Sequence, residues 1–143
     1  MKYIVYVLVG FLFLTSLKAT EQNNGNMIMI AGLQWHSDIN RAYTVAEKEN
    51  KHIIVMVAKE SCPWCRKMKE QTFTDTRIKE KLEKYTLVIM QHSDRSVYKH
   101  IPIFNRAVPS LFFMNSKREL YDKIIGYHTA DELLKDINDI EKL

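Results

Sequence analysis

Cysteine is scarce in this sequence, with two copies in 143 residues. Two cysteines can close only one bridge, which excludes a small scaffold held together by several disulfides. The pair is therefore better explained by chemistry than by a structural framework. The sequence also lacks the low hydrophobic content of a disordered chain, since 46% of its residues are hydrophobic. That content is enough for a core and the length is that of one domain, which argues against a disordered chain.

A strong charge of one sign is missing as well. The net charge of the whole chain is +4. Without Lys2 and Lys18 it falls to +2, because 19 basic residues then face 17 acidic ones. The sequence has no block of Lys and Arg with interleaved aromatic residues and no helix with a basic stripe. We therefore expect no nucleic-acid partner.

The long apolar run of the sequence, Tyr3–Leu17, lies at its start and is preceded by a lysine. This pattern predicts a secretory signal peptide over residues 1–19, with the cut after Ala19. Leu17 departs from the small residue expected two positions before the cut. An uncleaved membrane anchor is thus an alternative, although a spanning helix needs about 20 apolar residues; a buried core helix is a third. With a signal or an anchor, the domain would work in the periplasm or otherwise outside the cytoplasm.

Both cysteines lie in the stretch Ser61-Cys62-Pro63-Trp64-Cys65, between the apolar run Ile53–Ala58 and a charged segment. This arrangement predicts a strand that leads into a helix, with the first cysteine at the helix N-terminus. Unpaired backbone N–H groups and the helix dipole favour an anion there, and the thiolate is the reactive form of cysteine. Cys65 lies one turn further on and can close a disulfide with Cys62. We therefore expect the protein to exchange electrons through this pair.

The rest of the chain alternates between strand and helix patterns. A spacer with a first short strand is expected over residues 20–32, before a domain over residues 33–143. The expected elements are a helix over Trp35–Asn50 capped by Ser37 or Asp38, a doubly covered strand over His52–Ala58, helices over Pro63–Gln71 and Thr76–Lys84, a strand over Thr86–Met90, a turn or short helix within residues 92–105, a hairpin of Ser110–Met114 with Glu119–Gly126, and a final helix behind a capping box of Thr129 and Glu132. This order predicts an α/β fold with a mixed central β-sheet and helices on both faces.

Two motifs together resemble the thioredoxin superfamily. One is Cys62-Pro63-Trp64-Cys65 after a hydrophobic strand, and the other is Ala107-Val108-Pro109-Ser110 before a later strand. The resemblance covers most of residues 34–143 and implies a thioredoxin-like fold in which Pro109 is cis and lies beside the active disulfide. The segment after the cysteines is similar to that of exported bacterial thioredoxin-like proteins, including thiol-disulfide interchange domains and SoxW-type periplasmic thioredoxins.

The resemblance implies a thiol-disulfide oxidoreductase that needs no cofactor. Cys62 would attack a disulfide of a partner protein, and Cys65 would resolve the mixed disulfide. The partner would be bound by Pro63, Trp64, Val108 and Pro109, with the Val108 backbone pairing to an extended segment. We expect a monomeric reductase that receives electrons from a membrane donor. A disulfide-forming oxidase and a non-catalytic binding domain are the alternatives, and an isomerase is disfavoured.

The sequence departs from the family pattern at two points. Met56 lies six residues before the first cysteine, where cytoplasmic thioredoxins have a buried Asp that helps to move the proton of the second cysteine. Proton transfer would then use water or a nearby group. Glu60 and Lys59 are the nearest candidates by sequence, and the alternative for Glu60 is an exposed charge at a strand end. Pro63-Trp64 is closer to the Pro-Tyr of glutaredoxins, at roughly −200 to −230 mV, than to the Gly-Pro of thioredoxin, at roughly −270 mV. We therefore expect a less reducing pair.

A metal site and a structural disulfide are the competing interpretations of the cysteines. Two Cys could join two of the five His, but His92 and His100 are eight residues apart, outside the usual finger spacing. We therefore expect no metal. A structural disulfide would be buried and unreactive. Six methionines in apolar runs are interpreted as core residues and not as copper ligands: Met27, Met29, Met56, Met68, Met90 and Met114.

Overall fold

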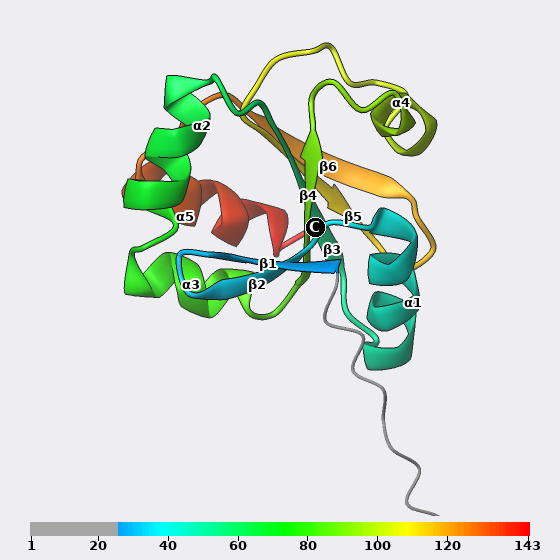
Figure 1. Cartoon of the computed structure of the whole chain (residues 1–143). Helices are drawn as coiled ribbons and strands as arrows, with labels where there is room; N and C mark the ends of the chain where they lie inside the picture. Colours follow the sequence, from blue (N-terminus) through cyan, green and yellow to red (C-terminus); the bar gives the residue numbers. More distant parts are fainter. Residues whose placement is uncertain (1–25) are drawn as a thin grey trace, which may run out of the picture.

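A computed structural model describes residues 26–143 (Figure 1), so the predicted leader lies outside the described residues. The strands are β1 (Met27–Ile30), β2 (Leu33–His36), β3 (Ile53–Ala58), β4 (Thr86–Gln91), β5 (Ser110–Met114) and β6 (Leu120–Ile125). The helices are α1 (Ile39–Glu49), α2 (Pro63–Lys67), the π-helical turn η2 (Met68–Thr72), α3 (Thr76–Leu82), α4 (Ser96–His100) and α5 (Ala130–Ile140). Within residues 26–143, none of these helices has the length and apolar character needed to span a bilayer.

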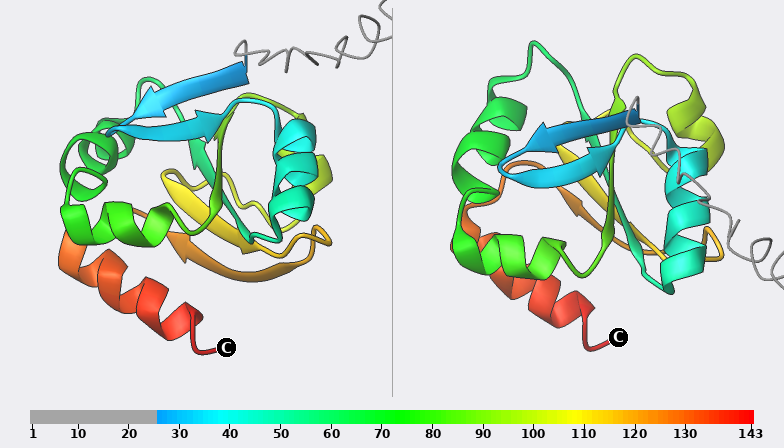
Figure 2. Two further views of the ribbon diagram at one scale, coloured as in Figure 1. Left: turned by 90° about the horizontal axis from the view of Figure 1, so that it is seen from below. Right: turned by 60° about the horizontal axis from the view of Figure 1, so that its bottom comes forward.

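The six strands form one mixed sheet in the order β1-β2-β4-β3-β5-β6. β3 pairs parallel with β4 and antiparallel with β5, and β5 forms the expected antiparallel hairpin with β6. Figures 1 and 2 show α2, α3 and α5 on one face of the sheet and α1 with α4 on the other. The predicted fold class, a mixed sheet covered on both faces, is therefore confirmed.

β3 is the centre of this sheet, and all six of its residues are buried. Side chains alternate between the two faces of a strand. Ile54 and Met56 accordingly join the cluster under α2, α3 and α5, whereas Val55 and Val57 join the cluster under α1. Each such side chain stabilises the fold by about 1.5–3 kcal/mol. Because β3 is fixed on both faces, the cysteine loop that follows its last residue starts from a rigid point.

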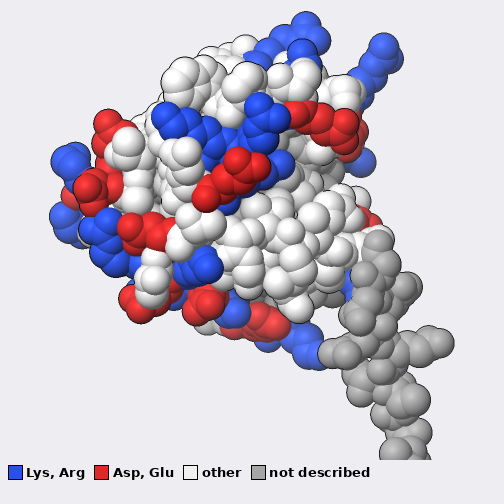
Figure 3. All heavy atoms as spheres, turned by 60° about the vertical axis from the view of Figure 1, so that its left-hand side comes forward, with Lys and Arg blue, Asp and Glu red and all other residues white. Residues whose placement is uncertain are grey.

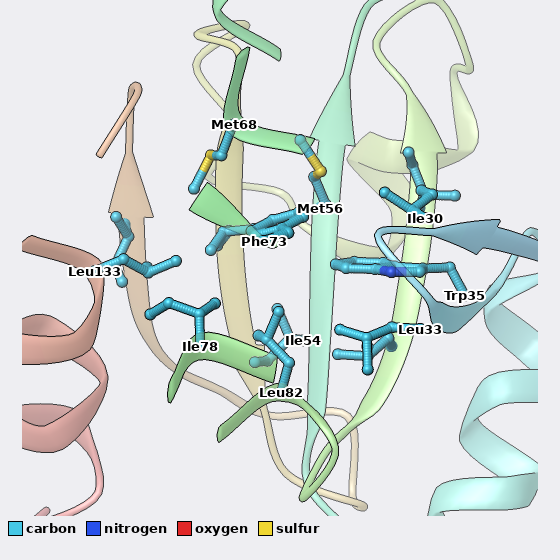
Figure 4. Packing of buried hydrophobic residues seen from close by; sticks show 14 of the residues in the cluster. Ile30, Leu33, Trp35, Ile54, Met56, Met68, Phe73, Ile78, Leu82 and Leu133 are labelled. Atoms are coloured by element: carbon cyan, nitrogen blue, oxygen red, sulfur yellow. The ribbon is translucent and has the colours of Figure 1, made fainter. Parts of the chain in front are cut away.

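The predicted helical position of Trp35 is wrong, because Trp35 lies in β2. Ala31 and Gly32 have φ angles of 54° and 80°, and a two-residue hairpin turn favours this left-handed conformation. The chain reverses there, and Trp35 points into the core, where its ring stacks on Phe73 at 5.4 Å (Figure 4). Helix α1 begins only at Ile39, where the Asp38 side chain accepts hydrogen bonds from two backbone N–H groups.

The methionines divide into two groups. Four of the six are buried as predicted, namely Met56, Met68, Met90 and Met114. Met29 is 61% exposed and Met27 is half-buried, so their assignment to the core is wrong. Both lie on β1, which is an edge strand of the sheet.

The helix that follows the cysteines changes its winding after one and a half turns. The Phe73 N–H donates to the Met68 carbonyl at 2.9 Å, which is the wider spacing of a π-helix. At the end of this turn the Thr72 hydroxyl donates to the His128 carbonyl at 2.6 Å. The end of η2 is thereby tied to the connection between β6 and α5, where the predicted capping box of Thr129 and Glu132 is present.

Candidate active site

Cys62 is the N-cap of α2. Its Sγ accepts a hydrogen bond from the backbone N–H of Cys65 at 3.1 Å, which satisfies one of the free N–H groups of the helix start. Pro63 occupies the first turn, where its missing N–H costs nothing. Cys62 is half-buried, so its sulfur can be reached from solvent while it receives the N–H.

Cys65 has the opposite environment. Its side chain is 1% exposed, and both cysteines are free thiols in this structure. Burial, with a further contribution from the hydrogen bond to Cys62, raises the pKa of Cys65 to about 11; the Lys59 backbone and the Lys69 charge act in the other direction. Because burial disfavours the charged form, Cys65 is held as a neutral thiol beside the accessible Cys62 sulfur.

The second motif lies against the first. The Val108–Pro109 peptide bond is cis, as the resemblance implied, and the Val108 carbonyl lies 3.9 Å from the Cys62 Sγ. Pro109 is buried and Val108 is half-buried. The Pro109 carbonyl accepts from the Gly126 N–H at 2.8 Å, and the Ser110 hydroxyl donates to the Ala107 carbonyl at 2.6 Å. These bonds hold the Val108 backbone next to the cysteines.

Trp64, between the cysteines, is 54% exposed and also packs locally. Its ring lies 5.3 Å from that of Tyr127. The Lys67 ammonium lies 5.2 Å from the Trp64 ring centroid and 4.7 Å from the Tyr127 ring centroid. The ammonium attracts both rings, so the Trp64 ring is held by Lys67 and Tyr127 while 54% of the residue stays exposed. Tyr127 was not a sequence candidate, and the sole signal for it was its position directly after the last strand.

Glu60 is not brought to the cysteines by any hydrogen bond or ion pair found within residues 26–143. It is exposed and lines a separate hollow of about 320 Å³. That hollow is completed by Lys59, Ser61, Gln91, His92 and Ser93. Met56 is fully buried in the same cluster as Cys65, and Figure 4 shows it beside Met68 and Phe73. The position behind the cysteines is thus filled by an apolar thioether, which accepts no proton.

The cysteines do not join histidines in the part of the chain that the structure describes. There, no group of three or more His, Cys, Asp and Glu side chains is placed to hold a metal ion. Figure 3 shows the face formed by α2, α3 and α5, with both signs of charge interspersed. The Arg77 guanidinium, for example, pairs with Asp75 at 2.8 Å and with Asp131 at 2.9 Å.

Comparison with known proteins gives consistent matches. Residues 39–141 match the family described as thioredoxin-like domain. The chain is 36% identical over 81 residues to a thiol:disulfide interchange protein, DsbD, of Campylobacter jejuni; the match covers 53% of this chain and 14% of that protein. Among solved structures it is similar to a thioredoxin from Thermus thermophilus (17% identity, TM-score 0.63, 73% of this chain and 84% of that one). It is also similar to the C-terminal domain of Neisseria meningitidis DsbD (16% identity, TM-score 0.59, 73% and 97%).

Proposed function

Because the chain belongs to the thioredoxin-like domain family, we propose that it is a thiol-disulfide oxidoreductase that acts on protein disulfides through Cys62 and Cys65. The observation that carries this proposal is the unequal environment of the two sulfurs. The Cys62 sulfur is accessible and receives a backbone N–H, whereas Cys65 is buried and neutral. Such a pair has a defined nucleophile and a defined resolving thiol.

The exchange proceeds in two steps that balance. The Cys62 thiolate attacks one sulfur of a partner disulfide; a mixed disulfide forms, and the other partner sulfur leaves as a thiolate. Cys65 then loses its proton to solvent and attacks the Cys62 sulfur. The Cys62–Cys65 disulfide forms and the second partner thiolate leaves, so two electrons pass from the dithiol to the partner. Oxidation of a partner dithiol runs the same steps backwards.

The partner would bind across the loop that contains the cis peptide bond. The Val108 carbonyl lies beside the nucleophile and can accept a hydrogen bond from an extended partner segment, which adds it in the manner of a β-strand. The exposed face of Trp64 supplies an apolar contact on the same side. Pro63 in the cysteine loop and Pro109 in the loop with the cis peptide bond would shape the surface that the partner contacts. Glu60 would have no part in it, and solvent would take the proton of Cys65.

We favour the reductase direction and a location outside the cytoplasm. The similarity to a thiol:disulfide interchange protein supports thiol-disulfide exchange, although the chain covers 14% of the length of that relative, and the apolar run Tyr3–Leu17 supports the location. A membrane electron donor would then keep the monomeric domain reduced, and a signal or anchor over residues 1–19 would deliver it. A disulfide-forming oxidase is the second candidate, since the N–H bonded to the Cys62 sulfur stabilises the reduced form. The SoxW-type resemblance remains a prediction.

Two measurements test this function. The first is the reduction potential of the Cys62–Cys65 pair, equilibrated with glutathione. A value between those of thioredoxin, about −270 mV, and the glutaredoxins supports the reductase, and one near about −120 mV supports the oxidase. The second is insulin reduction by the wild type, Cys62→Ser and Cys65→Ser. Cys62→Ser should be inactive, whereas Cys65→Ser should accumulate a mixed disulfide. An active Cys62→Ser protein would overturn the assignment of Cys62 as the nucleophile, and a wild type that never reacts would leave a non-catalytic domain.

A further inference from the structure

One face of the β1–β2 hairpin contains side chains that the redox function does not use. The register pairs Met27 with His36 and Met29 with Gln34. Directly paired residues, and residues two apart on a strand, lie on the same face. The opposite face of the hairpin packs into the core through Ile30, Leu33 and Trp35. The two thioethers and the imidazole therefore share the face that α1 covers only in part.

His36 is a buried side chain without a hydrogen-bond partner at one ring nitrogen. It is 7% exposed, and its Nδ1 is not paired with any of the described residues. A buried polar atom left unpaired costs about 1–3 kcal/mol, so such an atom calls for a ligand or another physical explanation. A neutral imidazole carries a lone pair on one ring nitrogen, with which it can bind a metal ion.

These side chains surround a hollow of about 560 Å³ between the hairpin, the end of α1 and the start of β4. Met27, Met29 and His36 are among the lining residues, as is Thr86. Thr86 is 5% exposed, and its hydroxyl is likewise unpaired among the described residues. Two residues that each carry an unpaired buried polar atom thus line a hollow to which Met27 and Met29 also contribute.

We propose that this hollow binds a soft monovalent cation, Cu(I), through the sulfur atoms of Met27 and Met29 and an imidazole nitrogen of His36. Thioether sulfur and imidazole suit Cu(I), whereas Mg²⁺ and Ca²⁺ take oxygen ligands. Directly paired residues on a sheet have Cβ atoms about 4.5–5.5 Å apart, and alternate residues of a strand are about 6.6 Å apart. Side chains as long as Met and His can span those distances to a common atom.

The charge around the hollow is compatible with a cation. Glu49 and Lys51 both line it and pair with each other at 3.1 Å, and Glu83 adds a second carboxylate. The site uses no cysteine and does not rest on the proposed redox function. It also differs from the competing metal interpretation of the sequence, which required the cysteine pair.

The test is Cu(I) binding by the full chain in its oxidised form, in which the Cys62–Cys65 disulfide removes the competing thiols. Competition against bathocuproine disulfonate under anaerobic conditions gives stoichiometry and affinity. We expect one equivalent of Cu(I), and at least a tenfold loss of affinity in the double variant Met27→Leu/Met29→Leu. Ile28→Leu changes the opposite face of the same strand and should bind as the wild type does. The proposal fails if the oxidised wild type takes up no Cu(I), or if the double variant binds equally well.

A second measurement uses the wild type alone and needs no variant. Ag(I) is a redox-inert probe for the same ligands, and NMR can follow the methionine methyl groups and the histidine rings of the oxidised wild type. We expect the Met27 and Met29 methyl signals and the His36 ring signals to shift together with one equivalent of Ag(I). The four buried methionines should keep their positions. Shifts confined to other histidines or to exposed carboxylates would overturn the assignment.

Discussion

The backbone N–H of Cys65 donates to the Sγ of Cys62 across 3.1 Å, while the Cys65 side chain is 1% exposed. One residue therefore supplies both the group that stabilises the nucleophile and the thiol that later displaces it. The two functions are separated within Cys65 because its main chain faces the helix start and its side chain faces the core.

The first prediction concerns the ionisation of Cys65. Burial is the largest cause of its raised pKa and is retained in Cys62→Ser. In that variant the rate of alkylation of Cys65 should rise about tenfold per pH unit from pH 7 to 9.5 without levelling off, because the thiolate is the reactive form. The same protein unfolded in guanidinium should level off near the ordinary cysteine value of about 8.5. A plateau below pH 8.5 in the folded variant would contradict the burial argument.

The second prediction concerns the apolar residue behind the cysteines. Met56→Asp places a carboxyl group where the side chain is 0% exposed and packed among Cys65, Met68 and Phe73. An unpaired buried polar group should lower the free energy of unfolding by about 2–5 kcal/mol at pH 7. Met56→Leu keeps the volume and should cost less than about 1.5 kcal/mol. Urea denaturation of both variants measures the free energy of unfolding. Equal losses would show that packing, and not polarity, determines the stability contribution of residue 56.

The third prediction concerns Lys67, whose ammonium lies against the rings of Trp64 and Tyr127. Lys67→Met should free Trp64, raise the KM for a protein disulfide several-fold and leave the reaction with a small disulfide nearly unchanged. Stability should fall by about 0.5–1 kcal/mol. Lys67→Arg keeps the cation and should restore the KM, and Arg66→Met controls for the loss of one positive charge on the same helix. If Arg66→Met raises the KM as much as Lys67→Met does, the change in KM comes from the loss of a positive charge and not from the contact of Lys67 with the two rings.

The fourth prediction separates the two residues that the sequence offered as the cap of α1. The Asp38 carboxylate accepts from the N–H groups of Asn40 and Arg41 at 2.9 and 3.3 Å. Asp38→Ala should therefore cost about 1 kcal/mol of stability. Ser37→Ala is the matched control, because Ser37 uses its backbone N–H, bonded to the Asn26 carbonyl, and should change stability by less than about 0.5 kcal/mol. Thermal unfolding of the two variants measures the two losses of stability. A larger loss in Ser37→Ala than in Asp38→Ala would refute the assignment of Asp38 as the cap.

The sequence predicted those parts of the fold whose causes are local. Local residues determine the continuous apolar run of β3, the cap signals at Asp38 and Thr129, and the hairpin of β5 and β6. The cysteine loop between β3 and α2 was equally local. The position of the Val108–Pro109 bond required the family resemblance, because nothing in its own neighbourhood indicates that Val108 lies beside Cys62, 46 positions earlier.

Other features could not be predicted because their causes are distant in the sequence. Trp35 fits a helical spacing with Ile39, and only its stacking on Phe73 and the turn at Ala31 and Gly32 place it in a strand. The contact between Lys67 and Tyr127 joins residues 60 positions apart. Met27 and Met29 look like core residues in sequence, and their partial exposure follows from the edge position of β1, which depends on the whole strand order.

The attachment of the β1–β2 hairpin has a consequence for the motions of the sheet. β2 meets β4 through one residue pair, His36 with Val88, whereas β3 and β4 pair over six residues. The hairpin is held by the Trp35 ring more than by main-chain hydrogen bonds. Its amides should therefore exchange with deuterium as a separate, faster cooperative unit, ahead of those in β3 and β4. Since the Trp35 ring stacks on Phe73, each opening of the hairpin would also loosen the turn that ends the cysteine helix. The amides of η2 should therefore exchange faster when the hairpin is destabilised.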